Sequence, residues 1–422
     1  MKKSIFLVSP FILLILTIPL GTLSLGSFGG ANIRIWEIFL IPALIITTIR
    51  GYPSYAFYSH MKVLVFVTAF YVIVLISGLN SGDNYDLFIK QSLLLFAMIS
   101  LFFVAASQNL TTHHKIITRS IMYSGIVASI AAIVDLSINP ESIQTYYFED
   151  QSLLRARGYF AEANEYSQFL GVPFSFILAT LIFENRINRI EWFILFCGLI
   201  FLFFMQLLSL SRGGLVAFFA NCVYMGFLAL YSNSKTGVLR RSCLLKYYCL
   251  LFILALGVLL LSLDIVIVNI ISERFKSILD GDDATSMIRL DSLFWGLRLI
   301  MDSFLFTMFG IGFGNLPNFM EERSATTANF IADITIETGF IGVIFFLLFL
   351  FNVAYLRKRK AQILFQSNEL SPIFLGSNMA LFGLIVGGLT YSTHMLNFLW
   401  LVLGLVTACK IEATKLSFPV LQ

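Results

Sequence analysis

Charged residues are scarce in this sequence: Asp, Glu, Lys and Arg make up 12% of its 422 residues, about half the share found in soluble domains. Hydrophobic residues make up 58%. Apolar runs of roughly 18 to 25 residues recur along the chain, and each is long enough to cross a hydrocarbon core about 30 Å thick. Little lies between them from which a separate soluble domain could be built. The composition therefore predicts one all-α polytopic membrane domain, residues 1–422, and excludes an ordinary soluble protein.

Cysteine and metal-binding patterns are also lacking. The five cysteines show neither a C-x-x-C pair nor a spacing to histidine, so neither a disulfide framework nor a zinc site is expected. The acidic "DGDD" at 280–283 has the form of an Asp-x-Asp metal clamp, but an acidic loop is the commoner meaning of such a run. "GIGFG" at 310–314 has no βαβ context and is not a nucleotide fingerprint. No metal and no other cofactor is expected.

Twelve membrane spans are predicted from the apolar runs. They are centred near residues 5–25, 33–49, 62–79, 87–107, 117–138, 166–183, 191–210, 213–231, 247–268, 330–356, 373–390 and 393–409. Lys and Arg collect on the cytoplasmic side of membrane proteins, and here they fall in alternate connections, the clearest being "RKRK" at 357–360. This asymmetry predicts that both termini are cytoplasmic.

Two connections on the opposite side are longer than the rest, residues 139–165 and residues 269–329. Long loops of this kind usually have a function. The second contains "MIRLDSLFWGLRLIMDSFLF", which predicts an amphipathic helix over 286–305.

The predicted helix has two different faces. At about 100° per residue, Asp291, Arg298 and Asp302 form one polar stripe. Arg289 projects from the other side, near Gly296, so the face that we expect to rest on the bundle carries one cation. Arg298 is readily explained by a side chain that reaches lipid headgroups, whereas Arg289 favours a functional role.

Four of the arginines on the outer side, against the charge rule, are taken as a set: Arg155 and Arg157 in the first long loop, Arg212 in "LSLSRGGLVAF", and Arg289. Cations at spans usually face a bundle interior or a watery cavity and mark a site. An alternative for Arg212 is a loop arginine that meets headgroups, in a turn where Gly213 and Gly214 let the backbone fold back. The planar guanidinium fork matches phosphate oxygens two at a time, so the set predicts a site for a lipid-linked phosphate or diphosphate.

The residues resemble the bacterial O-antigen polymerase and O-antigen ligase superfamily. The resemblance covers about residues 150–350, and its strength lies in the order and spacing of four degenerate motifs. These are "LLRARGYFAEANEYSQFL", "LSLSRGGLVAF", "SMIRLDSLFWGLRLIMDSFLFTMFGIGFGNLPNF" and "ANFIADITIETGFIGVIFFL". The ligase pattern has a histidine before the Asn that begins N-x9-G-x-x-G, and here that place is Ala328. This departure favours the polymerase branch.

The resemblance implies a GT-C-like membrane fold whose two long periplasmic loops contain helices, in the bacterial inner membrane, with the active site facing the periplasm. It implies a metal-independent glycosyltransferase that joins undecaprenyl-diphosphate-linked oligosaccharide repeat units in lipopolysaccharide biosynthesis. Membrane lipid and a polysaccharide chain-length regulator are candidate partners, and no nucleic-acid partner is expected. The alternatives are a ligase that transfers polymer to the lipid A core, and a flippase or other transporter, although the internal repeats typical of transporters are not found.

The candidate site residues follow from that chemistry. Negative charge grows on the diphosphate as the glycosidic bond breaks, and arginines aimed there stabilise the transition state. A group that takes or orients the acceptor hydroxyl proton is also needed. The predicted catalytic residues are Arg212, Arg289, Asp333, Glu337 and His394. The predicted substrate-binding residues are Arg157, Tyr159, Glu162, Asn164, Ser211 and Asn329, and Glu165 is a further candidate for the base.

Overall fold

The protein is predominantly helical, with two short β-hairpins. The computed structural model describes residues 2–20, 24–28, 31–50, 61–82, 85–138, 145–148, 151–184, 187–236, 284–319, 327, 329–356, 358–367, 369–391 and 396–417. The longer helices are α1 (Lys2–Thr17), α2 (Ile35–Arg50), α4 (Met61–Ser77), α5 (Tyr85–Ala106), α6 (Leu110–Ile138), α7 (Ala163–Phe183), α8 (Arg189–Leu208), α9 (Arg212–Thr236), α12 (Ala284–Met301), α15 (Phe330–Ala354), α17 (Ser371–Gly388) and α18 (Asn397–Ser417). The short elements are η1 (Ile18–Leu20), η2 (Gly78–Asn80), α13 (Phe304–Phe309), α14 (Leu316–Phe319), α16 (Lys358–Gln366), β1 (Ser24–Phe28), β2 (Ala31–Arg34), β3 (Thr145–Phe148) and β4 (Gln151–Leu154).

The chain has the helices of a membrane-embedded protein. Within the described ranges, seven helical segments are long and apolar enough to cross a bilayer: α4 with η2, α5, α6, α7, α8, α15 and α17. Shorter apolar stretches lie in α1 with η1, in α2 and in α9. These segments coincide with predicted spans, as does α18, whereas the predicted span at 247–268 lies outside the described residues. The all-α membrane character is confirmed, and the count of twelve spans stays a prediction.

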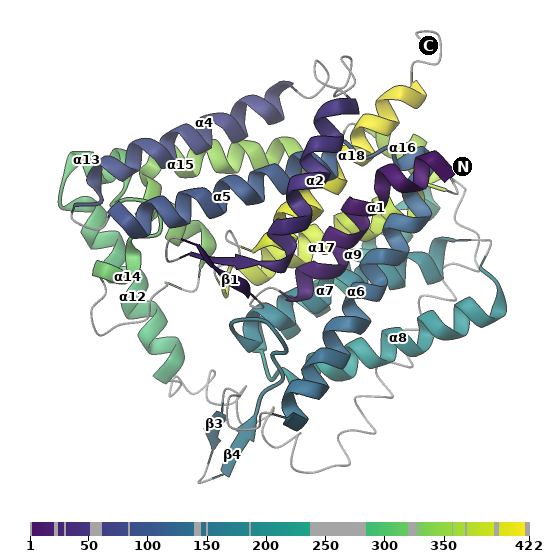
Figure 1. The fold of residues 1–422 in the computed structure, drawn as a ribbon, viewed down its shortest axis with the longest axis horizontal. Coiled ribbons are helices and arrows are strands. Elements are labelled where there is room, and N and C mark those ends of the chain that lie inside the picture. Colours follow the sequence, from purple (N-terminus) through teal and green to yellow (C-terminus); the bar gives the residue numbers. More distant parts are fainter. Residues whose placement is uncertain are drawn as a thin grey trace.

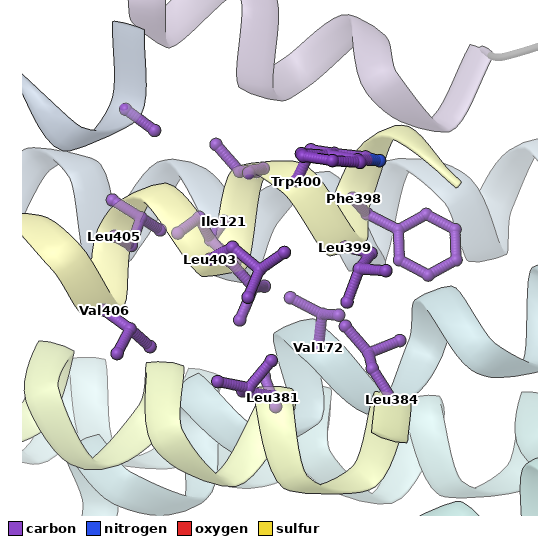
Figure 2. Close-up of a cluster of buried hydrophobic side chains, with 14 of the residues drawn as sticks. Ile121, Val172, Leu381, Leu384, Phe398, Leu399, Trp400, Leu403, Leu405 and Val406 are labelled. Carbon is purple, nitrogen blue, oxygen red and sulfur yellow. The ribbon is translucent and has the colours of Figure 1, made fainter. Parts of the chain in front are cut away.

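Helix α7 lies at the centre of the bundle, since its whole apolar length is buried. It packs against α6, α8, α9 and α17. Figure 2 shows the adjoining core, in which Leu399 and Leu403 of α18 lie toward Val172 of α7, whereas Trp400 lies on the other side of α18, where it stacks on Phe349 of α15. Close packing here needs small residues. Gly383 and Gly387 of α17 leave room for polar side chains of the neighbouring helices, Asn221 of α9 against Gly383 and Gln168 of α7 against Gly387.

The long connections differ in part from the prediction. The residues 139–165 contain the antiparallel hairpin β3–β4 and no helix before α7 begins at Ala163, so the expectation of a helix in the first long loop is wrong for its described residues. In the second long loop, the predicted helix 286–305 is two helices. Helix α12 ends at Met301, and Ser303 starts α13 because its hydroxyl accepts a hydrogen bond from the Phe306 amide at 3.1 Å, as an N-cap does.

The periodicity of α12 is confirmed by burial. Ser292, Gly296 and Ile300 are buried, and Ile336 of α15 lies against Gly296. The polar stripe faces away from this contact, because Asp291, Arg298 and Asp302 are exposed. Figure 1 shows α12, α13 and α14 at one end of the bundle formed by α4, α5 and α15.

We name the two ends of the bundle by the positions of the chain termini. At the terminal end, α1 begins and α18 ends (Figure 1). There the guanidinium of Arg119 lies 3.0 Å from Glu184 Oε2 and 2.6 Å from Glu191 Oε1, which joins α6, α7 and α8. The buried Lys410 donates hydrogen bonds to the Asn352 carbonyl at 2.8 Å and to the Tyr355 carbonyl, and thus satisfies carbonyls left open at the end of α15. The opposite end is called the distal end.

Candidate functional site

The end of the first long loop is hydrogen-bonded to the turn between α8 and α9 at the distal end. Arg155 Nε donates to the Ser209 carbonyl at 3.0 Å, and the Ala156 amide donates to the Leu208 carbonyl at 3.1 Å. The same arginine reaches Asn164 Oδ1 through Nη2 at 3.0 Å. The guanidinium therefore ties together the loop, the first turn of α7 and the α8–α9 turn, three segments that the sequence places up to about 55 residues apart.

Arg212 is the first residue of α9 and is half-buried. Ser211 precedes it as the N-cap, because its hydroxyl accepts a hydrogen bond from the Gly214 amide at 3.2 Å. This position puts Arg212 beside the positive end of the helix dipole, where anions bind. Arg155 thus binds the carbonyl of Ser209, three residues before Arg212 in the same turn.

The two glycines after Arg212 have a different role from the predicted one. Neither has a positive φ; within the described turn that conformation falls on Leu210, with φ 50°. Instead, a Cβ at Gly213 would overlap Thr390 Oγ1, and one at Gly214 would overlap Ser167 Oγ. The glycines let the start of α9 pack directly against α7 and the end of α17.

The first turn of α7 gathers charged and polar side chains. Glu162 is the residue before α7 and its side chain makes no capping bond, whereas Glu165 Oε2 accepts a hydrogen bond from the Ala161 amide at 3.2 Å. The Glu165 carboxylate also accepts a hydrogen bond from Tyr391 and faces the charge of Arg34. Two distant parts of the chain, the start of α7 and the segment just after α17, therefore meet at this carboxylate, and the charge of Arg34 in β2 acts on it.

Arg157 and Tyr159 lie just before this turn. Arg157 Nη1 donates to the Ala161 carbonyl at 3.4 Å. Gly158 has φ 55° and approaches Ala132 of α6, so the chain turns tightly between the two residues. Tyr159 is half-buried in this turn.

The predicted polar residues of α15 have different structural roles. Asn329 caps the helix, with Oδ1 accepting from the Ile331 amide at 3.0 Å and the Ala332 amide at 3.2 Å. Asp333 is buried, and its Oδ1 accepts hydrogen bonds from the Thr327 amide at 2.9 Å and the Thr327 hydroxyl at 2.7 Å. These contacts hold the start of α15 against the segment that precedes it.

Glu337 lies next to a break in α15. Gly339 has φ 68° and ψ −176°, a conformation essentially confined to glycine. The break frees the carbonyls of Ile336 and Glu337, which accept hydrogen bonds from the amides of Ile311 at 3.0 Å and Gly312 at 3.2 Å. Glu337 itself is buried at this junction.

The segment that supplies these amides, Gly310–Asn315, is called the glycine strap. It is fastened to the end of α4 and to η2: Asn80 Nδ2 donates to the Gly310 carbonyl at 2.7 Å, and the Phe313 amide donates to Ser77 Oγ at 3.2 Å. The "GIGFG" of the sequence therefore has a structural task, because its glycines allow a close backbone approach to a broken membrane helix.

Some predicted site residues fall outside the described residues. His394, Ala328 and the "DGDD" at 280–283 are among them. Arg289 is part of α12, but its side chain is not described. Within the described part of the chain, no group of three His, Cys, Asp or Glu side chains could hold a metal ion.

Arg34, Tyr391 and Asn80 were not singled out from the sequence. Arg34 begins the second predicted span on the outer side, and the charge rule that selected the other arginines could have found it. No comparable signal marks Tyr391 or Asn80, since each acts through a partner more than 200 residues away in the sequence.

Comparison with known proteins gives no match, either to a protein-family model or to a curated protein sequence.

Proposed function

We propose that this protein is an O-antigen polymerase: a metal-independent glycosyltransferase that joins undecaprenyl-diphosphate-linked repeat units at the periplasmic face of the bacterial inner membrane. The observation that carries the proposal is the arrangement of the four sequence motifs. Each of them contributes residues to the distal end of the bundle, and they contact one another in pairs.

The first and second motifs meet through Arg155, which bonds to both Asn164 and the Ser209 carbonyl. The third and fourth meet where Ile336 packs on Gly296 and where the glycine strap bonds to the α15 break. A site for a lipid-linked diphosphate needs such a gathering of loop residues at one end of a membrane bundle, because the reacting diphosphate lies at the membrane surface.

In this proposal the arginines bind the diphosphate of the donor. Arg212, at the start of α9, combines a guanidinium with the amide groups of a helix N-terminus, and both favour an anion. Arg157 approaches from the first loop, and Arg289 belongs to α12, whose buried residues pack on α15. As the bond between the donor sugar and the diphosphate breaks, these cations stabilise the growing negative charge.

The test uses purified wild-type protein and three single variants, Arg212→Ala, Arg289→Ala and Arg298→Ala. The substrate is lipid-linked oligosaccharide extracted from cells that lack the protein, and product length is followed on a gel in the presence of EDTA. We expect a ladder from the wild type and at least about a 100-fold loss of rate for Arg212→Ala and Arg289→Ala. Arg298→Ala is the matched control, because Arg298 is exposed on the polar stripe of α12 and its loss is expected to change the rate by less than about threefold.

The remaining outcomes separate the alternatives. Transfer that requires added lipid A core would identify a ligase and overturn the polymerase proposal. A wild type that is silent with either acceptor, yet moves lipid-linked oligosaccharide across vesicle membranes, would identify a transporter. A ladder that disappears in EDTA would refute the metal-independent chemistry.

A further inference from the structure

The carboxylate of Glu165 is the best-positioned acid of the described distal end. It lies in the first turn of α7, and the Ala161 amide donates to its Oε2 at 3.2 Å. The hydroxyl of Tyr391 donates to the same carboxylate, and the charges of Glu162 and Arg34 act on it. The side chain is oriented by these protein groups and keeps part of its surface exposed.

Three of the other described candidates for a proton acceptor make structural contacts, whereas Glu162, the residue before α7, makes no capping bond and is tested alongside Glu165. Asn329 is an N-cap and its amide cannot take a proton. Asp333 is buried and accepts two hydrogen bonds from Thr327. Glu337 is buried where the glycine strap closes the break in α15.

Glu165 is also close to the predicted diphosphate site. Its neighbour Asn164 accepts a hydrogen bond from Arg155, which in turn binds the α8–α9 turn that leads to Arg212. A base must lie within reach of the acceptor hydroxyl while the cations hold the leaving group, and the start of α7 brings these two requirements together.

We propose, on the basis of the function proposed above, that Glu165 is the general base of the polymerase and that Tyr391 is its positioning residue. The acceptor sugar hydroxyl attacks the anomeric carbon of the donor sugar, and a new glycosidic C–O bond forms. The bond between that carbon and the diphosphate oxygen breaks, and the diphosphate leaves with the bonding electron pair. The hydroxyl proton passes to a Glu165 carboxylate oxygen, and solvent removes it afterwards.

The experiment compares the wild type with Glu165→Gln, Glu165→Ala, Glu162→Gln and Tyr391→Phe, each checked for folding by its thermal unfolding in detergent. Asp86→Asn is the matched control, because Asp86 is an exposed carboxylate in the first turn of α5 and no part of the site. Initial rates of sugar transfer are measured against the concentration of extracted lipid-linked oligosaccharide and across pH, with and without sodium formate.

We expect Glu165→Gln to lower kcat by about 100-fold or more with little change in KM, and to abolish the acidic limb of the pH profile. Formate should partly restore Glu165→Ala, since a small carboxylate can replace the missing base. Tyr391→Phe should lower kcat less and move the acidic limb, because the base remains but is no longer held. Glu162→Gln should lower kcat by less than about tenfold, and Asp86→Asn should match the wild type.

An active wild type whose Glu165→Gln variant has kcat within about threefold of normal would overturn the assignment of the base and leave the proposed function intact. The same holds if Glu162→Gln produces the larger loss and Glu162→Ala is the variant that formate restores. A wild type that is silent with this substrate would overturn the proposed function, and the base with it.

Discussion

Replacing Gly339 by alanine is expected to destabilise the protein by about 3 to 5 kcal/mol. The backbone conformation at the α15 break, φ 68° and ψ −176°, costs a residue with a Cβ about 1 to 3 kcal/mol. The added Cβ would also overlap the carbonyl group of Met308, which is main chain and cannot move aside by itself. If the strap is pushed away, the two hydrogen bonds to the Ile336 and Glu337 carbonyls are lost, at about 1 kcal/mol each.

Two other glycines provide graded controls. Gly82 also has a positive φ, 60°, but a Cβ there meets nothing within 4 Å, so Gly82→Ala should cost only the backbone strain, about 1 to 2 kcal/mol. Gly198 lies within α8, where a Cβ would make ordinary contacts at 3.6 Å to Ile126 Cδ1 and 3.7 Å to Ile177 Cδ1. Gly198→Ala should therefore be neutral, or stabilising by up to about 1 kcal/mol.

The assay is reversible unfolding in mixed micelles of dodecyl maltoside and SDS, from which the free energy of unfolding is obtained for each variant. Gly310→Ala should resemble Gly339→Ala, because Gly310 has φ 76° and its Cβ would overlap the Glu337 main chain. Both substitutions disrupt one contact, so the double variant should cost clearly less than the sum of the two. A Gly339→Ala variant that is no less stable than Gly82→Ala, or a strictly additive pair, would refute the reasoning.

The same assay checks three further expectations. Arg119→Met should cost about 2 to 3 kcal/mol, because two largely buried carboxylates lose the guanidinium they share, and only the exposed Lys115, 3.9 Å from Glu184, remains; a neutral result would mean that water already screens the cluster. Gly387→Val should cost about 1 to 3 kcal/mol by forcing α17 away from Gln168, and Gln168→Ala should recover part of that loss. Lys410→Met should cost about 1 to 3 kcal/mol, since the Asn352 and Tyr355 carbonyls lose their donor, and an unchanged stability would show that they find another.

The helices were predictable because membrane spans are defined by local composition. The buried face of α12 was predictable for a similar reason, since Ser292, Gly296 and Ile300 recur at the helical period and are buried. The end of α12 was missed because Ser303 caps a new helix within a continuing apolar pattern.

The candidate site was only partly predictable. The arginines could be selected because each breaks the charge rule on its own. The glycine strap could not be predicted, because its role depends on a hydrogen bond between Asn80 and Gly310, which lie 230 residues apart in the sequence. The association of Arg34 and Tyr391 with Glu165 is likewise a product of tertiary packing.

The glycine strap has a consequence for how such a protein can change in evolution or by design. Two amides of the second long connection complete the hydrogen bonding of a helix that crosses the membrane, and the polar ends of α4 and η2 hold those amides in place. A chimera that exchanged this loop alone would leave the carbonyls of two buried residues, Ile336 and Glu337, without their hydrogen-bond donors, at about 1 to 3 kcal/mol each. Loop exchange between proteins of this architecture should therefore yield folded products only when residues 77–81 and the segment around Gly339 are exchanged with it.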